Sequence, residues 1–437
     1  MANKTGVVAI IGQANVGKSS LFNALVGRRD AIVAKEAGTT RDSISAKASY
    51  KNTDFWLVDT AGMKPAEDEF ELTIQEQIAE ASESADLILV VVDAGSQITE
   101  EDRRIAKSAL KTRKPVILVV SKADTNKRLN NEEWRALGVK DIVATSATQK
   151  SGLEELLEDL VLLLPKSRIK VADNRIKLAF VGRPNVGKSS LFNKLGVKQQ
   201  AVVSERAGTT RDVNRLVIKY HEREIELMDT AGIRRSGKIE RGVEQFSVLR
   251  ALSAIEEADI SVVLIDSTEL NTALDQKIAG MVKDSYKGLI LVVSKWDKAA
   301  DIELEKQTVA QQVSSDFAFV PWAPLVFTSS ETGENATKIF ELALEIAENR
   351  ISKFKTSELN NWLQKTVRTH EPAGLHGQMP KLNYMVQEDD MDYPSFKVFG
   401  AHTKALHWSY KRYMERSFRE NWPLAGTPLK FWFIEKN

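Results

Sequence analysis

The sequence predicts an α/β protein with two similar domains, each a mostly parallel β-sheet covered by helices on both faces, and a small α+β domain after them. First, a Gly-rich stretch that begins at Gly12 recurs 170 positions later at Gly182. Second, short apolar runs alternate with helix-like amphipathic segments around both copies, as in parallel sheets with helical crossovers. Third, this alternation stops after about residue 350. The chain is therefore expected to contain a duplicated domain and a different tail.

The first copy supplies the clearest pattern of strands and helices. Apolar runs of four to seven residues bounded by polar or Gly-containing segments are typical of buried strands. The predicted strands are 7–11, 45–50, 55–59, 87–93, 116–121 and 142–145, and the predicted helices are 69–83, 102–111 and 151–163. We therefore assign residues 1–165 to the first domain and 166–174 to a short linker of mixed charge.

The second copy repeats this order, and the tail departs from it. Its predicted strands are 178–181, 217–220, 225–229, 260–266, 289–294 and 325–328, and its last helix is 334–349. In the tail we predict a helix at 357–370, strands at 381–387 and 395–399, a long basic helix at 403–420 and a final strand at 429–434. The second domain is therefore assigned to 175–350 and the tail domain to 351–437.

The length and composition of the chain limit the classes of protein and the kinds of site that it can contain. A chain of 437 residues is too long for one core, and 43% hydrophobic with 28% charged residues is ordinary for a globular protein. The net charge of +1 gives no overall argument for a nucleic-acid or membrane partner. No cysteine is present, which excludes disulfides and thiolate metal sites and fits a reducing compartment. No apolar run approaches the roughly 20 residues of a membrane span, and the first predicted strand leaves no room for a signal peptide. We expect a cytoplasmic protein.

Both Gly-rich stretches fit the phosphate-loop pattern G-x-x-x-x-G-K-S. Each follows an apolar strand and runs into a helix, which is the context that phosphate binding requires. Backbone N–H groups of such a loop, with the helix N-terminus, face an anion. We expect Lys18 and Lys188 to reach the β- and γ-phosphates and the hydroxyls of Ser19 and Ser189 to bind Mg²⁺. Two copies in one context exclude a chance Gly-rich turn.

Two further repeated motifs fit the remaining needs of phosphoryl transfer. DTAG places Asp59 and Asp229 at strand ends, where a carboxylate holds Mg²⁺ through water. Gly62 and Gly232 would each offer a backbone N–H to the γ-phosphate. The threonine pairs Thr39–Thr40 and Thr209–Thr210 lie in Gly-containing loops, and one threonine of each pair, Thr40 and Thr210 by our assignment, would close onto Mg²⁺. Such a closure is an order–disorder switch.

The SKxD segments at Ser121 and Ser294 predict the base that is read. Asp124 and Asp297 follow buried strands and could accept hydrogen bonds from N1–H and the 2-amino group of guanine. Adenine lacks both donors and would leave a carboxylate unpaired. Ser146–Ala147 and Ser329–Ser330, after the last strand of each domain, are candidates for backbone contacts to the base. The predicted nucleotide is therefore GTP or GDP.

The motifs together resemble a known family. NVGKSSLFN occurs twice, AGTTRD occurs twice, and DTAGIRRSGKIERGVEQFSVLRA spans 229–251. The tail contains YPSFKVFG, SYKRYMERSFRE and GTPLKFWF. This set resembles the EngA (Der) family of bacterial ribosome-assembly GTPases within the TRAFAC class, over essentially the whole chain. The nucleotide-binding residues that the resemblance and the motifs imply are Gly12, Asn15, Val16, Gly17, Lys18, Ser19, Ser20, Asp59, Thr60, Ala61, Gly62, Met63, Ser121, Lys122, Asp124, Ser146 and Ala147, with Gly182, Asn185, Val186, Gly187, Lys188, Ser189, Ser190, Asp229, Thr230, Ala231, Gly232, Ile233, Ser294, Lys295, Asp297, Ser329 and Ser330 in the second domain.

The resemblance also carries expectations about activity and partners. It implies a KH-like tail without the G-x-x-G clamp and a role in maturing the large ribosomal subunit through rRNA contacts. We expect the protein to act as a monomer. It implies slow hydrolysis, because Met63 and Ile233 stand where related enzymes carry a water-positioning glutamine. It implies K⁺ activation through Asn15 and Asn185. Ser121 and Ser294 replace the family's usual asparagine, which braces the phosphate loop and touches the base, and Ala14 replaces the usual proline.

Two alternatives to a GTPase switch remain. One is an RNA-binding scaffold whose nucleotide sites are largely structural, which the two serines allow. The other is a tRNA-modification GTPase, disfavoured because no cysteine-bearing or folate-type domain is present. The basic residues of 403–420, with Trp408, Tyr410 and Tyr413 among them, suit rRNA phosphates and bases, or simply a solvated helix face whose aromatics pack inward.

Overall fold

The computed structural model describes residues 5–26, 45–51, 53–59, 85–125, 131–164, 175–198, 215–229, 244–270, 272–299, 305–374 and 378–435. The chain divides into two compact units. One contains Asn3–Val171 with Ser236–Glu256, and the other contains Met1–Ala2, Ala172–Arg235 and Glu257–Asn437. The predicted helix at 69–83 lies outside the described residues. In the described part of the chain, no helix is long and apolar enough to cross a membrane.

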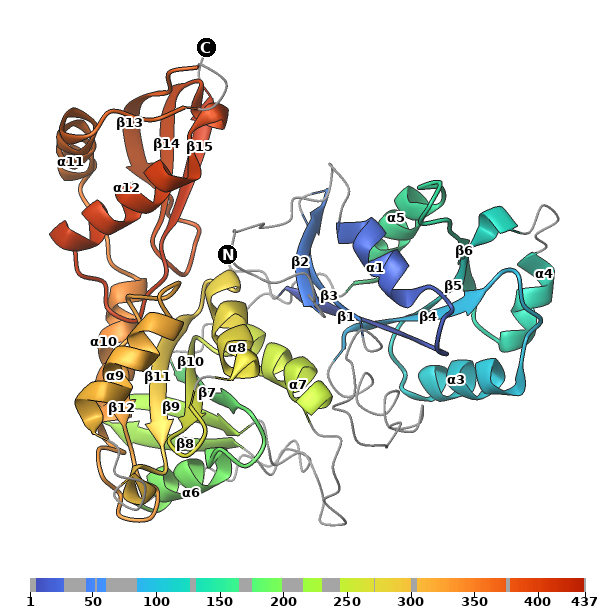
Figure 1. Ribbon diagram of the computed structural model, residues 1–437, viewed down its shortest axis with the longest axis horizontal. Coiled ribbons are helices and arrows are strands. Elements are labelled where there is room, and N and C mark those ends of the chain that lie inside the picture. The colour runs from blue at the N-terminus through green and yellow to red at the C-terminus, as the bar shows by residue number, and fades with distance from the viewer. Residues whose placement is uncertain are drawn as a thin grey trace. The chain divides into compact units, whose positions relative to one another are not determined.

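The first P-loop domain is built on a six-stranded sheet (Figure 1). Its strands are β1 (Gly6–Gly12), β2 (Ser45–Tyr50), β3 (Thr53–Asp59), β4 (Leu87–Asp93), β5 (Val116–Ser121) and β6 (Asp141–Ala144). They lie in the order β2-β3-β1-β4-β5-β6, and only the β2–β3 pair is antiparallel. The mostly parallel sheet predicted from the alternating pattern is confirmed.

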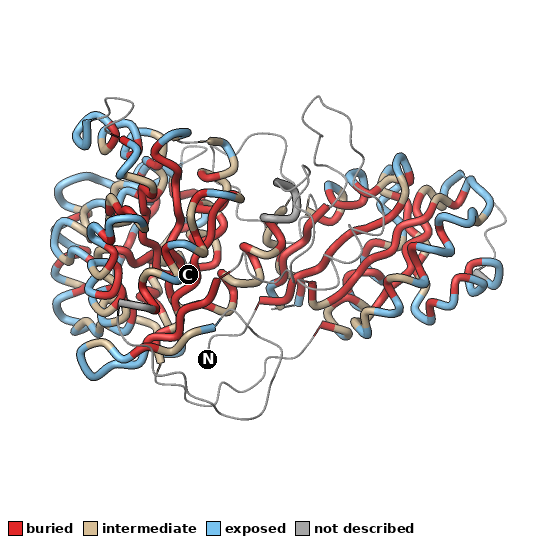
Figure 2. The backbone as a smooth tube through the Cα atoms, turned by 90° about the horizontal axis from the view of Figure 1, so that it is seen from below, coloured by how far each residue is buried: buried red, intermediate tan, exposed pale blue. Residues whose placement is uncertain are grey.

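Helices cover both faces of this sheet because alternate strand residues are apolar on both sides. Val8 and Ile10 of β1 belong to a core shared with α1 (Lys18–Val26) and α5 (Leu153–Leu163). Ala9 and Ile11 belong to the opposite core, shared with α3 (Glu100–Lys111) and the short α4 (Asn131–Trp134). Figure 2 shows the strands buried and the outer sides of the helices exposed. β1 is therefore buried along its whole length, between the two cores.

The second P-loop domain repeats this architecture. Its strands are β7 (Ile176–Gly182), β8 (Arg215–Tyr220), β9 (Arg223–Asp229), β10 (Ile260–Asp266), β11 (Gly288–Ser294) and β12 (Leu325–Phe327), in the order β8-β9-β7-β10-β11-β12. Helices α6 (Lys188–Lys198) and α10 (Lys338–Arg350) share one core. Helices α8 (Ala273–Asp284) and α9 (Lys306–Asp316) lie in the same compact unit, whereas α7 (Glu244–Glu257) falls, except for Glu257, in the unit of the first domain. The matching strand order confirms the domain duplication.

The C-terminal domain is a three-stranded sheet with two helices. Its elements are α11 (Thr356–Thr369), β13 (Lys381–Gln387), β14 (Ser395–Ala401), α12 (Trp408–Asn421) and β15 (Lys430–Glu435). The order is β13-β14-β15, antiparallel and then parallel. Phe396, Tyr410 and Phe418 lie in its aromatic core. The α-β-β-α-β order predicted for the tail is confirmed.

One predicted helix of the tail is wrong at its start. We expected a continuous helix over 403–420, but α12 begins at Trp408, after a single 3₁₀ turn at Thr403–Ala405. Leu406 is extended and forms a β-bridge with Gly374, and the His407 N–H donates to the Ala373 carbonyl at 2.9 Å. The helix does not begin earlier because Leu406 and His407 bond to a distant segment through their backbone. Lys404 is therefore not on α12.

The C-terminal domain and the second P-loop domain lie in one compact unit and share backbone hydrogen bonds. The Leu289 N–H of β11 donates to the Gly426 carbonyl at 2.9 Å, and the Gly426 N–H donates to the Trp322 carbonyl at 2.8 Å. Gly426 has φ 65°, and a Cβ there would lie 2.2 Å from Ile346 Cδ1, so only glycine fits. Tyr286 and Tyr393 stack with ring centroids 4.7 Å apart. The turn at Gly426 thus links the C-terminal domain to the start of β11.

Candidate functional site

The candidate site of each domain lies at the carboxyl ends of its parallel strands. In the first domain β1 is central, with β3 on one side and β4 on the other, and the chain crosses from one side to the other here. Such a reversal of strand order is where ligands of open α/β sheets bind. Gly12 ends β1 and Gly182 ends β7, and α1 and α6 begin at Lys18 and Lys188. Both phosphate-loop motifs therefore form strand–loop–helix connections at that edge, as predicted.

The loop backbone explains why the motif needs glycine and asparagine. Gly12 has φ 153°, and a Cβ there would lie 2.4 Å from the Val91 carbonyl oxygen of the neighbouring strand. Asn15 and Asn185 each have φ 63°, a left-handed conformation that asparagine tolerates better than most residues. Both asparagines are exposed on the loop. The remaining predicted residues of these loops and first helical turns, Val16, Gly17, Ser20, Val186, Gly187, Ser189 and Ser190, lie alongside them.

The two P-loop lysines are buried under their own loops. Lys18 Nζ donates to the Gly12 carbonyl at 2.8 Å and also to the Gln13 carbonyl. Lys188 Nζ donates to the carbonyls of Gly182 at 3.0 Å and Arg183 at 2.5 Å. Burial lowers the pKa of the Lys18 ammonium, and the Asp59 carboxylate opposes this shift. The repeated arrangement places a lysine Nζ beneath each predicted phosphate-binding loop.

The oxygen ligands expected for Mg²⁺ come together in the first domain. Ser19, at the start of α1, donates its hydroxyl to the Asp59 carboxylate at the end of β3, over 2.6 Å. Hydroxyl and carboxylate oxygens are hard donors that suit Mg²⁺, which takes its other ligands from water and substrate phosphates. Among the described residues no group of three or more acidic or histidine side chains could hold a metal by itself. This donor set fits a metal that binds together with a nucleotide. In the second domain Asp229 ends β9 at the equivalent place.

The aspartates that we predict to read the base lie on short 3₁₀ turns after β5 and β11. Asp124 and Asp297 are exposed, at Ala123–Thr125 and Trp296–Lys298. Ser329 donates its hydroxyl to the Asp297 carboxylate at 2.5 Å. In the first domain the hydrogen bond from Ser146 lowers the pKa of Asp124. The loops after β6 and β12, with Ala147 and Ser330 beside these serines, therefore hold both carboxylates in place.

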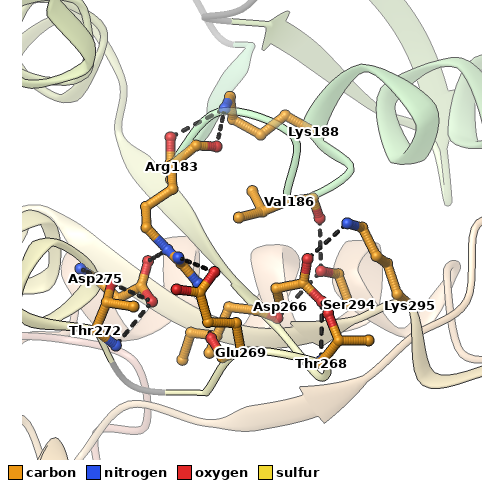
Figure 3. A network of polar contacts seen from close by, with 12 residues as sticks. Arg183, Val186, Lys188, Asp266, Thr268, Glu269, Thr272, Asp275, Ser294 and Lys295 are labelled. Atoms are coloured by element: carbon orange, nitrogen blue, oxygen red, sulfur yellow. Dashed lines mark hydrogen bonds and ion pairs between the residues drawn. The ribbon is translucent and has the colours of Figure 1, made fainter. Parts of the chain in front are cut away.

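The serines that replace the family's usual asparagine hold the phosphate loop. Ser294 lies at the end of β11 and its hydroxyl contacts the carbonyl of Val186 at 2.6 Å and that of Ile265 at 3.1 Å (Figure 3). Because a hydroxyl has one proton, we assign the donated bond to the closer Val186 carbonyl. Ser121 contacts the carbonyls of Val16 and Val92 in the same way. The bracing contact to the phosphate loop survives the replacement.

Removing this contact is expected to weaken nucleotide binding in the second domain. Ser294→Ala should raise the Kd for GDP by roughly fivefold, because a buried hydrogen bond contributes about 1 kcal/mol. Titration with a fluorescent GDP in a Lys18→Ala background reports the second site alone. Ser261→Ala is the matched control, because Ser261 is a buried serine of β10 whose hydroxyl has no hydrogen-bond partner in the described structure. An unchanged Kd for Ser294→Ala would contradict the brace.

Sequence reasoning missed the acidic residues that end β4 and β10. Lys122 Nζ donates to the Asp93 carboxylate at 2.7 Å and to the Asn15 carbonyl at 2.9 Å. Lys295 Nζ donates to Asp266 at 2.6 Å (Figure 3). The hydrogen bonds of Lys295 and Thr268 outweigh the effect of burial and lower the pKa of Asp266. The signal available was that Asp93 and Asp266 follow matching apolar runs at the same offset as the SKxD segments.

Several predicted residues lie outside the described residues. These are the threonine pairs and the rest of the DTAG motifs, namely Thr39, Thr40, Thr60, Ala61, Gly62, Met63, Thr209, Thr210, Thr230, Ala231, Gly232 and Ile233. Their expected roles remain predictions.

The basic residues near the C-terminal helix divide into two groups. Arg416 and Arg419 are paired with Glu420 and Glu415 one turn away. Lys411 lies over the Phe433 ring at 5.4 Å from its centroid, and Arg412 lies over Trp408 at 4.8 Å. The Trp408 side chain is 55% exposed.

The tyrosines of the same helix face inward. Tyr410 is buried and its hydroxyl donates to the His370 carbonyl at 2.9 Å, while Tyr413 donates to the Thr366 carbonyl at 3.2 Å. One alternative that we considered was that the aromatic residues of this helix pack inward. This alternative is correct for the two tyrosines. Trp408 differs, since it leaves an exposed aromatic ring beside a cation.

Comparisons with known proteins match all three domains of the chain. A family model described as "50S ribosome-binding GTPase" matches residues 7–122 and 177–295, and one described as "KH-domain-like of EngA bacterial GTPase enzymes, C-terminal" matches 353–433. GTPase Der of Herpetosiphon aurantiacus is 41% identical over 97% of this chain and 95% of its own length. GTPase Der of Chloroflexus aggregans is 41% identical over 97% and 96%. A solved G domain of the T. maritima FeoB iron transporter is 30% identical over 36% of this chain and 98% of its own, with a TM-score of 0.28.

Both P-loop domains and the C-terminal domain are thus matched by family models, in this order, and the GTPase Der relatives match along 97% of the chain. The chain belongs to the Der (EngA) family of GTPases.

Proposed function

We propose that this GTPase is a nucleotide-controlled switch that binds the large ribosomal subunit during its assembly. The proposal is supported by the presence in one chain of two phosphate-loop motifs and a KH-like domain. The KH-like domain shares backbone hydrogen bonds with the second P-loop domain. The matched family description, 50S ribosome-binding, points to the same partner. We assign the first GTPase domain to 1–165, the linker to 166–174, the second GTPase domain to 175–350 and the KH-like domain to 351–437, acting as a cytoplasmic monomer.

Each site is proposed to bind GTP with the residues predicted above. Lys18 and Lys188 carry positive charge to the β- and γ-phosphates, and Asp124 and Asp297 read the guanine edge. Ser19 with Asp59, and Ser189 with Asp229, would hold Mg²⁺, which neutralises charge on the phosphates during transfer. Thr40 and Thr210 complete the metal ligands, and the backbone N–H groups of Gly62 and Gly232 meet the γ-phosphate. With Met63 and Ile233 beside them, water is poorly positioned and intrinsic hydrolysis is slow.

The exposed C-terminal surface made by Trp408, Lys411 and Arg412 is proposed to contact rRNA. Cations neutralise phosphates, and an exposed indole offers a face on which an unpaired base can stack. Arg416 and Arg419 are left out of this surface because each is paired with a glutamate. We expect Lys411→Ala/Arg412→Ala to weaken subunit binding and to leave GTP hydrolysis by the free protein unchanged.

Co-sedimentation with purified large subunits tests this function. The full chain is mixed with subunits in GDP or in a non-hydrolysable GTP analogue, and binding that depends on the nucleotide is expected. Equal binding in both would instead favour an RNA-binding scaffold whose nucleotide sites are structural. No binding in either would refute the proposed partner and leave the GTPase assignment standing.

K⁺ is proposed to activate hydrolysis through Asn15 and Asn185. Both are exposed on their loops with φ 63°, beside the place proposed for the phosphates. A monovalent cation held there would stabilise charge on the transferring phosphoryl group, the role that an arginine finger plays in other GTPases. We expect a several-fold higher rate in KCl than in NaCl.

The double variant Asn15→Gly/Asn185→Gly is the matched test of this K⁺ effect. Glycine removes the amide oxygen and still accepts the left-handed backbone. The ratio of the KCl and NaCl rates should fall to one in this variant. Equal rates in both salts for the unmodified protein would remove K⁺ from the mechanism.

A further inference from the structure

The side chain of the second residue of each phosphate loop, Gln13 or Arg183, hydrogen-bonds to the start of a helix that is distant in sequence. The hydrogen bonds differ between the two domains. In the second domain Arg183 Nε donates to Asp275 at 3.1 Å, and its terminal nitrogens donate to the Glu269 carboxylate and to the Glu269 carbonyl, both at 2.7 Å (Figure 3). Asp275 is fully buried and Arg183 is 6% exposed. The loop is thereby joined to the β10–α8 connection by three hydrogen bonds from one guanidinium.

The helix start that receives Arg183 is itself rigid. Thr272 caps α8, accepting from the Asp275 N–H, while the Asp275 carboxylate accepts from the Thr272 N–H at 3.3 Å. This reciprocal capping box uses one carboxylate oxygen, and Arg183 takes the other. Burial raises the pKa of Asp275, and Arg183 opposes that shift. A buried carboxylate that is paired in this way has one strongly preferred geometry.

The backbone of the same arginine touches the P-loop lysine. The Arg183 carbonyl accepts from Lys188 Nζ, so the residue contacts the helix start through its side chain and the lysine through its backbone. The position of Arg183 therefore fixes the loop end from which Lys188 is held. Arg183 acts through Lys188 and the loop N–H groups, which makes it a positioning residue.

The first domain repeats the geometry with a neutral side chain. Gln13 Nε2 donates to Asp102 at 2.9 Å and to the Thr99 hydroxyl at 2.5 Å, and Thr99 and Asp102 form the capping box of α3. The turn after β4 matches that after β10, since the Ser96 N–H bonds the Asp93 carbonyl as the Glu269 N–H bonds the Asp266 carbonyl. Ser96 therefore stands where the second domain has Glu269. The first loop has neither the cation nor the second carboxylate.

We propose that this position sets how firmly each domain holds its nucleotide, with Arg183 keeping the second phosphate loop preorganised and Gln13 leaving the first loop more easily deformed. A preorganised loop loses less freedom on binding and opens less often, so nucleotide leaves it more slowly. This makes the second domain the slow-exchanging site and the first the fast-exchanging one. The inference rests on the proposed nucleotide sites and goes beyond them.

The proposal is tested by exchanging the residues that make these hydrogen bonds between the two domains and measuring the rate of GDP release. The rate of fluorescent GDP release is measured by stopped flow in the full chain, with Lys18→Ala isolating the second site and Lys188→Ala the first. Arg183→Gln is expected to speed release from the second site at least tenfold, because glutamine can still bond Asp275, as Gln13 bonds Asp102, without the charge. Arg183→Lys should recover part of the slow rate. Gln13→Arg with Ser96→Glu rebuilds the charged tie in the first domain and should slow release there.

Slower GDP release from the first site in the Gln13→Arg/Ser96→Glu variant distinguishes a positioning effect from a folding defect, because damage to the fold cannot slow release. Arg215→Gln is the matched control: it breaks the ion pairs of an arginine on β8 with Glu226 and Glu257 in the same domain, and should leave release unchanged. Release rates within twofold of the parent for both Arg183→Gln and the Gln13→Arg/Ser96→Glu pair would overturn the proposal. If instead the lysine backgrounds fail to remove their own sites, the nucleotide-site assignment itself is wrong.

Discussion

Replacing Lys188 with alanine is expected to reduce nucleotide binding from two molecules per chain to one. Lys188 is 7% exposed and its ammonium lies under the second phosphate loop, held by two loop carbonyls. Removing one partner of a buried charge pair costs about 3–5 kcal/mol, or roughly two to three and a half orders of magnitude in Kd. Isothermal titration with GDP should therefore detect only the first site.

The control for this loss is another lysine of the same domain. Lys219 is exposed on β8, and Lys219→Ala should keep two sites. Lys18→Ala should remove the first site by the same reasoning, and the double variant should bind no GDP. A stoichiometry of two for Lys188→Ala would refute its assignment as the phosphate-binding lysine.

Asp297→Asn is expected to shift the second site from GTP toward XTP. In the proposed site the aspartate carboxylate would accept from both N1–H and the 2-amino group of guanine, whereas an asparagine amide would place its own N–H against that amino group. Xanthine carries a carbonyl there and can accept the amide proton. A site built for one hydrogen-bond pattern rejects the wrong pattern strongly, and we expect about a 100-fold loss for GTP.

Competition between GTP and XTP in a Lys18→Ala background measures this preference. Ser329 holds the Asp297 carboxylate at 2.5 Å, and an amide in its place can still accept that hydroxyl proton. The loop should therefore keep its shape in the variant. Asp316→Asn, in the last turn of α9, is a control that should leave the preference unchanged. A variant Asp297→Asn that still prefers GTP would exclude Asp297 as the base-reading residue.

Local pattern predicted the sheets and the phosphate loops well. Each strand boundary depends on short apolar runs, and Lys18 and Lys188 lie at fixed spacings from the glycines that shape the loop. Because these features depend on residues within about ten positions of one another, they can be predicted from the local sequence pattern. The strand order also followed, because both domains repeat one alternation of strands and helices.

Contacts between distant segments were not predictable in this way. Arg183 and Asp275 are separated by 92 positions, and neither residue type signals the other. The start of α12 at Trp408 depends on a bridge to Gly374, which interrupts a stretch that looks helical by itself. The serines at Ser121 and Ser294 were recognised only as departures from the usual asparagine. Their bracing contact became visible once the loop carbonyls were placed.

The pairing of Leu289 with Gly426 has a consequence for the order of synthesis. The first part of β11 leaves the ribosome long before the segment around Gly426, and at roughly 5–20 residues per second the delay is on the order of ten seconds. During that interval the Leu289 N–H and the apolar residues around it lack their final neighbour. Apolar surface and an unpaired backbone N–H that are exposed during that interval favour association with other chains. The nascent second GTPase domain therefore passes through a period of vulnerability that ends only when the C-terminal domain has been made.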